Sequence, residues 1–492
     1  MRAQLTGWLE RPGIPVLVVR GFGSQSYVQV VRERTARDER PAVLLYIDVY
    51  TPAEAVAFLE ERLTGDGAGH LLDGRQGELA AALGHLPLTL GHAAAYLMAE
   101  ELTCTAYLAR LADQTLRLDD VLPDWADTER YQRQITAGLL LSLTAAEQTG
   151  PPGLVEPLLR LIALLDPDGH PESLWTATAA TGYLNSTRQH TTAQDTTTGE
   201  VLRALQVLRR YGLITSDPNT PHRQLRMHAL TARAARETTP HGQQAVLAVT
   251  AADALTETWG SDGHVHHDLA QALRANTTVL RHHCEEHLWR EGLHRVVFRT
   301  GRDLLHSGLY RDAHAYWLPL AEKAAQALGR DHPDTIMLRA NLAIAYSSLG
   351  RYEDALALEE QVRTDFEQIL GPDHPDTLSA RANLAISYWD LGRYEDALAL
   401  EEQVRTDRER ILGPDHPDTL SARANLAITY SRLERNQEAL ELQEKVRTDR
   451  ERVLGPDHPD TLSAHTDLAA TYGRLGRHPD ADRLRGQEGE RV

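Results

Sequence analysis

The C-terminal part of the chain, from about residue 299 onward, repeats one pattern of apolar and polar positions. The phrase DHPDT recurs every 42 residues, at Asp331, Asp373, Asp415 and Asp457. Between these marks, apolar residues return at helical spacing and form one stripe, which in one unit comprises Leu378, Leu384, Ala385, Tyr388 and Leu391. A weaker unit precedes them, built around Gly308, Tyr310 and Ala313. The fixed period predicts an array of helical units.

Local signals divide each unit into two helices. Asp376 or Thr377 can cap the first helix by accepting from the free N–H groups of its opening turn, and Gly392 ends that helix. The second helix begins near Tyr394 and ends where a Gly-Pro pair follows. Its expected buried residues are Ala397, Leu400 and Val404. Because one such hairpin cannot bury its own apolar face, the units are expected to stack into a superhelix.

The repeated text is nearly verbatim, as in RANLAISYWDLGRYEDALALEEQVRTD. Its elements NLAxxY, GRYEDAL and LGPDHPDT resemble the tetratricopeptide repeats of kinesin light chains. That resemblance implies a groove, lined by the first helix of every unit, that receives an extended peptide or a segment of a partner protein. Carried over residue by residue, the partner-binding positions are Asn341, Ile344, Ser348, Asn383, Ile386, Asp390, Asn425, Ile428 and Arg432, followed in a unit that departs from the pattern by Asp467, Ala470 and Arg474.

The spacing of these positions supports one shared stripe. Asn383, Ile386 and Asp390 stand at i, i+3 and i+7, so they lie on the same side of a helix. An Asn amide offers two donors and an acceptor, which suits the backbone of an extended peptide. The alternative is that these Asn side chains bond neighbouring helices, since buried polar groups need partners.

Charged residues also recur in register with the repeat. Arg339, Arg381 and Arg423 stand two residues before each Asn, and inter-repeat ion pairs with acidic residues of the second helices are the favoured interpretation. Paired acids are expected on the exposed side of the second helices, as a solvated face, at Glu359-Glu360 and Glu401-Glu402.

The front part of the chain does not repeat. Short apolar runs at 15–20 (PVLVVR) and 43–49 (VLLYIDV) are typical of buried parallel strands, and TPAEAVAFLEERL predicts a helix with a Thr-Pro start. Further on, VLRALQVLRRYGLITSD predicts a helix and a strand, followed by a polar turn, the strand QLRMH and another helix. A helix feeding a two-stranded wing is the profile of a winged-helix domain. The Thr-rich stretch 185–200 is predicted to be a solvated loop.

The order of three short motifs resembles the back half of signal-transducing NTPases of the NB-ARC (STAND) type. VLVVR, GHLPLTL and MHAL carry the resemblance, and it implies nucleotide-reading roles for Arg20, Pro87 and His228. No GxxxxGK followed by Ser or Thr occurs in the sequence, however, so the backbone cradle and Lys of a P-loop are missing. We therefore expect these three residues to be vestigial and to serve packing, with no cofactor. Two alternatives stay open, a pocket that still binds ATP or ADP and a fragment of a longer NTPase.

These signals predict a mainly α-helical chain, an α-α superhelix preceded by a partial α/β remnant. The expected parts are a truncated α/β NTPase remnant at 1–62, a helical ARC-like domain at 63–150, a winged-helix-like domain at 151–240, a helical connector at 241–298 and the tetratricopeptide superhelix at 299–492.

Composition narrows the class of partner. The formal charge of −19 disfavours nucleic acid, because an acidic body repels a phosphate backbone. A DNA-binding winged helix stays a rival on the local positive charge of Arg203, Arg209, Arg210, Arg223 and Arg226. No apolar run approaches the roughly 20 residues that cross a bilayer. Two cysteines exclude a disulfide framework, and the chain is expected to be cytoplasmic.

Two histidine patterns could in principle carry chemistry. His283 and His287 stand at i, i+4, a spacing that can hold zinc, but the chain has 23 His and no further ligands are evident, so no metal is expected. The His-Pro-Asp of each repeat recurs at every helix start, which favours loop structure over an acid–base pair. The sequence thus predicts a scaffold or regulatory protein that binds a protein or peptide segment without catalysis, of undetermined oligomeric state.

Overall fold

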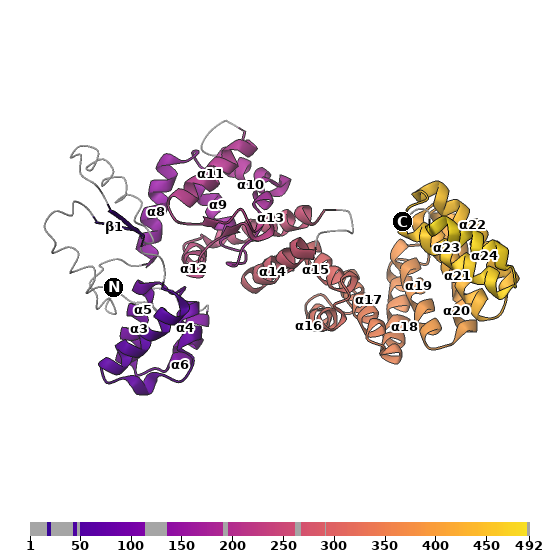
Figure 1. Ribbon diagram of the computed structural model, residues 1–492, viewed down its shortest axis with the longest axis horizontal. Helices are drawn as coiled ribbons and strands as arrows, with labels where there is room; N and C mark the ends of the chain where they lie inside the picture. Colours follow the sequence, from indigo (N-terminus) through magenta and orange to yellow (C-terminus); the bar gives the residue numbers. More distant parts are fainter. Residues whose placement is uncertain are drawn as a thin grey trace. The chain divides into compact units, whose positions relative to one another are not determined.

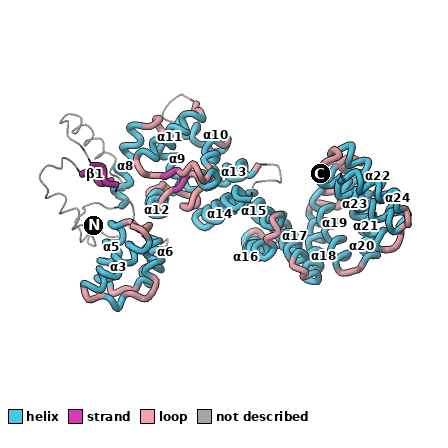
Figure 2. The backbone as a smooth tube through the Cα atoms, viewed as in Figure 1, coloured by secondary structure: helices cyan, strands magenta, loops and turns pink. Residues whose placement is uncertain are grey.

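The computed structural model describes residues 17–20, 43–46, 50–113, 135–189, 195–260, 267–290 and 292–489. It is mainly α-helical and falls into two compact units, Met1–Val297 and Phe298–Val492. Figure 1 shows the helices coloured along the chain, and Figure 2 shows how little strand accompanies them. The predicted fold class is therefore confirmed.

The first unit opens with two parallel strands and a helical group. β1 (Leu17–Arg20) pairs in register with β2 (Val43–Tyr46), at the places where the apolar runs predicted strands. Thr51 and Glu54 then form a capping box, which explains why α3 begins where it does. The helices of this group and the short 3₁₀ turn between them are α3 (Pro52–Gly65), η1 (Gly69–Leu71), α4 (Gln76–Ala82), α5 (Pro87–Glu100) and α6 (Cys104–Ala112).

A second helical group follows in the same unit and contains the predicted wing. β3 (Thr215–Ser216) pairs antiparallel with β4 (Leu225–Arg226), between α11 (Thr198–Arg210) and α12 (Ala229–Glu237). The helix–hairpin–helix order is therefore present, although the hairpin is short. The other elements are α8 (Ile135–Thr149), α9 (Val155–Ile162), η3 (Glu172–Thr176), α10 (Thr178–Gln189), η4 (Pro221–Arg223), α13 (His241–Trp259), α14 (His267–Cys284) and η5 (Glu285–Leu288).

The prediction of a loop over 185–200 is partly wrong. Helix α10 continues to Gln189, and α11 begins at Thr198. The Thr197 hydroxyl caps α11 by accepting from the N–H of Glu200 at 3.3 Å, and the Glu200 carboxylate accepts from the Thr197 N–H at 3.0 Å. Part of the Thr-rich stretch is therefore helical, and Thr197 caps the start of α11 instead of lying in a solvated loop.

The second unit consists of helix pairs. They are α15 (Arg295–His306) with α16 (Tyr310–Ala327), α17 (Pro333–Ser348) with α18 (Tyr352–Ile369), α19 (Pro375–Asp390) with α20 (Tyr394–Ile411), α21 (Pro417–Arg432) with α22 (Asn436–Leu454), and α23 (Pro459–Arg474) with α24 (His478–Gly489). The helices pack successively from α16 onward, while α15, which begins at the end of the first unit, contacts α16 through Phe298 and Trp317. Within each repeat the small Ala355, Ala397 and Ala439 are fully buried, which lets the paired helices approach closely.

The cap of the first helix differs from the prediction. His374, rather than Asp376 or Thr377, is the N-cap of α19, and its Nδ1 accepts from the N–H of Asp376 at 3.2 Å. The Thr377 hydroxyl instead donates to the Gly371 carbonyl at 2.8 Å and ties the preceding loop to the helix. His332, His416 and His458 cap their helices in the same way. The repeated His-Pro-Asp is thus a structural feature of the helix start.

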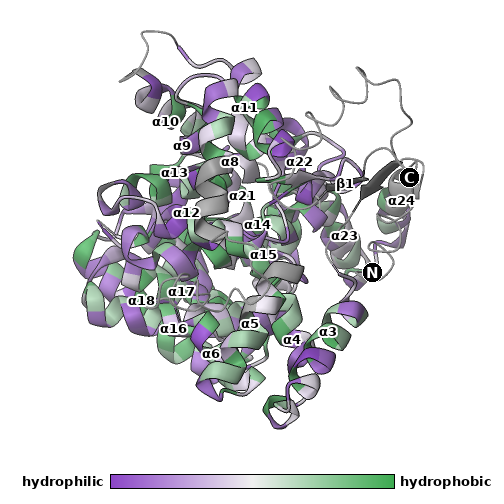
Figure 3. Cartoon of the chain, turned by 90° about the vertical axis from the view of Figure 1, so that its left-hand side faces the viewer, coloured by the Kyte–Doolittle hydropathy of each residue, from purple (hydrophilic) through white to green (hydrophobic). Residues whose placement is uncertain are grey.

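The helices are amphipathic. Figure 3 shows hydrophobic and hydrophilic residues side by side on the same helices. Across the described ranges, no helix is both long enough and apolar enough to cross a membrane.

Candidate functional site

The first helices of successive repeats lie side by side in the second unit. The Ser347 hydroxyl on α17 donates to the Asp390 carboxylate on α19 at 2.8 Å. The Arg432 guanidinium on α21 lies over the Trp389 ring, 5.2 Å from its centroid. Contacts of this kind make one continuous surface, which we call the first-helix face and define by α17, α19, α21 and α23.

The predicted partner-binding residues differ in how accessible they are. Ile386 is 42% exposed, which is unusual for a large apolar side chain in this chain. Asn383 and Asn425 are half-buried, and their side-chain amides form no hydrogen bond with another residue of the described ranges. Half-buried positions also include Ile344, Asp390, Ile428 and Asp467, whereas the exposed ones are Ser348, Arg432, Ala470 and Arg474.

Asn341 departs from the other two asparagines. It is buried, and its amide donates to the Met337 carbonyl of its own helix at 2.8 Å. Thus it does not bond a neighbouring helix through that group, and it offers less to a partner than Asn383 or Asn425. Asp467, its counterpart in the last unit, has a raised pKa because it is buried, while the charges of Arg450 and Arg474 act in the opposite direction.

Two of the three arginines of the ladder form the predicted inter-repeat ion pairs. Arg381 reaches Glu367 at 2.8 Å and Asp407 at 3.1 Å, so it joins the second helices of two successive repeats. Arg423 repeats this with Glu409 at 2.7 Å and Asp449 at 3.0 Å, and only 3% of its side chain is exposed. Arg339 differs, because its ion pair with Asp365 at 2.6 Å joins the two helices of its own repeat. The ion pairs of Arg381 and Arg423 link successive repeats.

The prediction for the paired acids is wrong for half of them. Glu359 and Glu401 are 4% and 7% exposed rather than solvated. Burial raises the pKa of each to about 7, while the hydroxyls of Ser387 and Thr429 act in the opposite direction. Their spacing could have signalled this, because Glu401 falls on the helical stripe of Ala397 and Val404.

The other member of each acidic pair bonds the next repeat. Glu360 accepts from the Tyr388 hydroxyl at 3.3 Å, and Glu402 accepts from Tyr430 at 2.9 Å. Glu444 accepts from Tyr472 at 2.6 Å in the same register. These acids therefore take part in stacking instead of forming a free face.

The three residues with a resemblance to nucleotide-reading positions lie in the first unit. Arg20 is the last residue of β1 and Pro87 the first of α5, but their side chains lie outside what the structure describes. His228 caps α12, and its Nδ1 accepts from the Leu230 N–H at 3.2 Å. Whether any of them serves a nucleotide stays a prediction.

His228 is brought against Gly84, in the segment that contains Pro87. Gly84 has φ +66°, and a Cβ there would lie 1.5 Å from the His228 Nε2. Burial lowers the pKa of His228, while its hydrogen bond with the Gly84 backbone acts in the opposite direction. Only glycine fits this position, both for its backbone conformation and for the space that the imidazole takes.

No metal cluster emerges from the described residues. His283 is near the end of α14, whereas His287 lies in η5, so the i, i+4 helical spacing is not maintained. No group of three or more His, Cys, Asp or Glu that could hold a metal occurs within the described ranges. Cys104 and Cys284 are both buried free thiols.

Comparison with known proteins assigns the array. The tetratricopeptide repeat model matches residues 335–376, 377–418 and 419–460, so the chain contains a tetratricopeptide repeat array. No curated protein matches the sequence.

Several solved structures are similar to the chain. The TPR-like repeats of a kinesin light chain candidate from Podosopora anserina are 28% identical, with 40% of this chain and 96% of that chain covered and a TM-score of 0.36. BtubC from P. vanneervenii is 18% identical, with 51% of this chain and 93% of that chain covered and a TM-score of 0.37.

A Signal Transduction ATPase with Numerous Domains from Pyrococcus horikoshii, which carries a tetratricopeptide repeat sensor, is 11% identical. The match covers 90% of this chain and 60% of that chain, with a TM-score of 0.38. Because every TM-score is below 0.5, the assignment of the array rests on the repeat model.

Proposed function

We propose that the chain is a scaffold or regulatory protein whose array holds an extended segment of a partner protein along the first-helix face, without catalysis. The observation that carries the proposal is the exposed Ile386 between Asn383 and Asp390, with Asn425 in the same position one repeat further on. The backbone of an extended peptide could form hydrogen bonds with these amides, while an apolar side chain of the peptide contacts Ile386.

A division of roles follows from the chemistry of these residues. The amides of Asn383 and Asn425 would hold backbone groups of the partner, so they would contribute affinity without reading its sequence. Ile386 and Ile428 would contact its apolar side chains. Arg432 and Arg474, both exposed, would contribute charge preference near one end.

The experiment uses the full chain and a library of random peptides displayed on phage. A selected peptide would be synthesised and its Kd measured by fluorescence anisotropy for three proteins: wild type, Asn383→Ala with Asn425→Ala, and Gln403→Ala. Gln403 is an exposed amide on α20, outside the first-helix face, and is the matched control.

The double variant is expected to weaken binding about ten-fold or more, because two net hydrogen bonds of roughly 1 kcal/mol each are lost. The control is expected to leave Kd unchanged. Equal affinities for all three proteins, or no selected peptide, would refute binding at this face.

A nucleotide-responsive switch is the alternative, and calorimetric titration with Mg-ATP and with ADP tests it. One-to-one binding that disappears in His228→Ala would support a nucleotide site in the first unit. Absence of heat at a protein concentration that detects micromolar affinity would reject the nucleotide switch, and the scaffold proposal would remain.

A further inference from the structure

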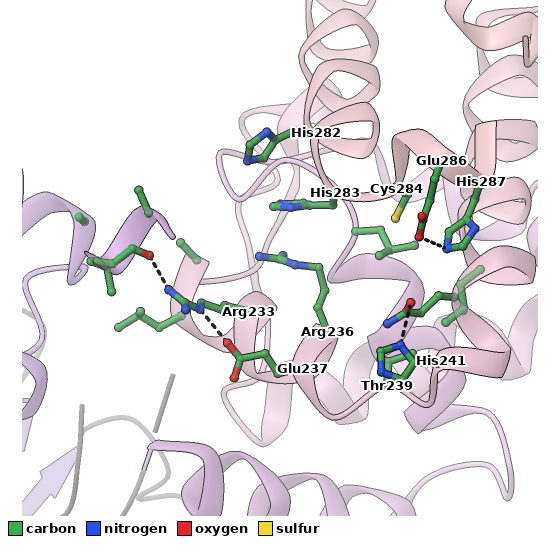
Figure 4. Close-up of a pocket in the computed structure, with 18 of the residues that line it drawn as sticks. Arg233, Arg236, Glu237, Thr239, His241, His282, His283, Cys284, Glu286 and His287 are labelled. Atoms are coloured by element: carbon green, nitrogen blue, oxygen red, sulfur yellow. Dashed lines mark hydrogen bonds and ion pairs between the residues drawn. The ribbon is translucent and has the colours of Figure 1, made fainter. Parts of the chain in front are cut away.

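A cavity of about 620 Å³ lies in the first unit. Residues of α6, α12, α13, α14 and η5 line it, and Figure 4 shows the polar ones. Its volume falls in the range of small-molecule sites, roughly 300–1,000 Å³. The apolar part of the wall includes five leucines, Leu108, Leu111, Leu164, Leu230 and Leu247.

The polar part of the wall contains one arginine without an acidic partner. The Arg236 Nη1 donates to the Ala163 carbonyl at 2.6 Å, and no Asp or Glu of the described chain forms an ion pair with Arg236. Arg233, one turn earlier on α12, differs because its Nε donates to Glu237 at 2.8 Å. Burial lowers the pKa of Arg236 to about 10, which remains far above neutral pH, so the guanidinium is charged.

Among the described residues that line the cavity, no carboxylate forms an ion pair with Arg236, although the effect of burial on its pKa is opposed by the nearby charge of Glu237, which raises it. Glu237 forms an ion pair with Arg233. The side chain of Glu286 is 80% exposed and contacts His287. His283 lies next to Arg236, and burial, followed by the charge of Arg236, lowers the pKa of His283 to about 3. The imidazole is therefore neutral, and Arg236 is the guanidinium of the described cavity wall that has no carboxylate in direct contact.

We propose that this cavity binds a small organic carboxylate, whose charged group pairs with Arg236 and whose apolar body lies against the leucines. A charge removed from water is costly unless it is paired, and an anion would supply the pair. Because Nη1 is occupied, Nε and Nη2 remain on one edge of the guanidinium, which matches the two oxygens of a carboxylate. One positive charge suits a monoanion better than a phosphate dianion.

The inference concerns the first unit and stands apart from peptide binding by the array. The test uses the full chain with sodium octanoate, 1-octanol and sodium phosphate as probes, in calorimetry and thermal denaturation. Octanoate is expected to bind one-to-one and to raise the Tm with concentration. The neutral 1-octanol is expected to bind about ten-fold more weakly or worse, since a charge-assisted hydrogen bond is lost.

Variants locate the site. Arg236→Gln is expected to weaken octanoate binding about ten-fold or more, whereas Arg203→Gln, an exposed arginine on α11, leaves it unchanged. Ala112→Trp narrows the cavity from an exposed position at the end of α6 and is also expected to weaken binding, even if the Arg236 variant fails to fold. Equal octanoate binding by all variants, no binding at all, or tighter binding of phosphate would overturn the proposal.

Discussion

Glu401 on α20 lies buried beside Thr429 on α21, the first helix of the next repeat, and burial raises the pKa of Glu401 to about 7. Glu359 occupies the same place one repeat earlier, beside Ser387. The next repeat has the uncharged Gln443 at this position, buried in the same way. The array thus carries two ionisable groups at a position where a neutral amide also fits.

Replacing Glu401 with Gln is therefore expected to stabilise the array at about pH 8. The folded pKa lies above the ordinary value of 4.5, so stability is fullest below that value and is lost as pH rises through about 7. Since one pKa unit corresponds to about 1.4 kcal/mol, we expect a gain of roughly 1–3 kcal/mol at about pH 8 and a smaller gain near pH 5.

Denaturation midpoints at both pH values measure this difference. Glu395→Gln, at an exposed acid on the same helix, is the control, and its stability should differ little from that of the wild type at either pH. If the Glu401→Gln variant is no more stable than wild type at either pH, burial of the Glu401 carboxylate does not lower the stability of the array.

Removing the Arg423 guanidinium is expected to destabilise the array strongly. Arg423→Met leaves Glu409 and Asp449 without their shared partner in a half-buried place, at a cost of roughly 2–4 kcal/mol. Arg410→Met, whose ion pair with Asp373 is more than half exposed on both sides, should cost about 1 kcal/mol or less. Urea denaturation of the two variants provides the comparison, and equal losses would show that burial of the pair is unimportant.

Adding one methyl group at Gly301 is expected to disturb the start of the array. A Cβ there would lie 2.1 Å from the indole of Trp317, which is fully buried on α16. Gly301→Ala should cost roughly 1–3 kcal/mol, because a buried indole must move.

Gly473 on α23 offers the opposite case, since no atom lies within 4 Å of the place that an added methyl group would take. Gly473→Ala should raise stability by up to about 1 kcal/mol through helix propensity. Thermal denaturation of both variants decides the point, because only the packing explanation predicts effects of opposite sign.

Loss of one histidine cap is expected to loosen a single repeat. His374→Ala leaves the Asp376 N–H without its acceptor and should cost about 1 kcal/mol, whereas His374→Asn supplies another cap and should restore most of it. Hydrogen exchange at the opening turn of α19 measures the effect locally. Exchange that is equally fast in both variants would show that the side chain's acceptor is not what holds the turn.

Local signals were sufficient for the elements of the array. The 42-residue period and the breaks at glycine predicted the helix pairs, and charge in register with the repeat predicted the inter-repeat ion pairs of Arg381 and Arg423. The stripe of Asn383, Ile386 and Asp390 followed from helical spacing, because residues three, four and seven apart share a helix face.

Other features could not be read from local signals. An acidic pair looks solvated in any window of sequence, and the burial of Glu401 depends on where the next repeat lies. His374 does not stand out as a cap because Asp and Thr are commoner caps, although its ring nitrogen reaches the Asp376 N–H. The contact between His228 and Gly84 joins positions 144 residues apart in the chain.

The sequence by itself therefore determined the repeated helices, their ends and the stripe they share, because each depends on residues within one or two helical turns. Only the tertiary structure decided which charges are buried and which are neutralised. Arg233 and Arg236 are three residues apart on α12 and both line the cavity, yet only Arg233 forms an ion pair with a carboxylate of the described chain. Electrostatic environment is set by whatever packs against a side chain, and those neighbours come from distant parts of the chain.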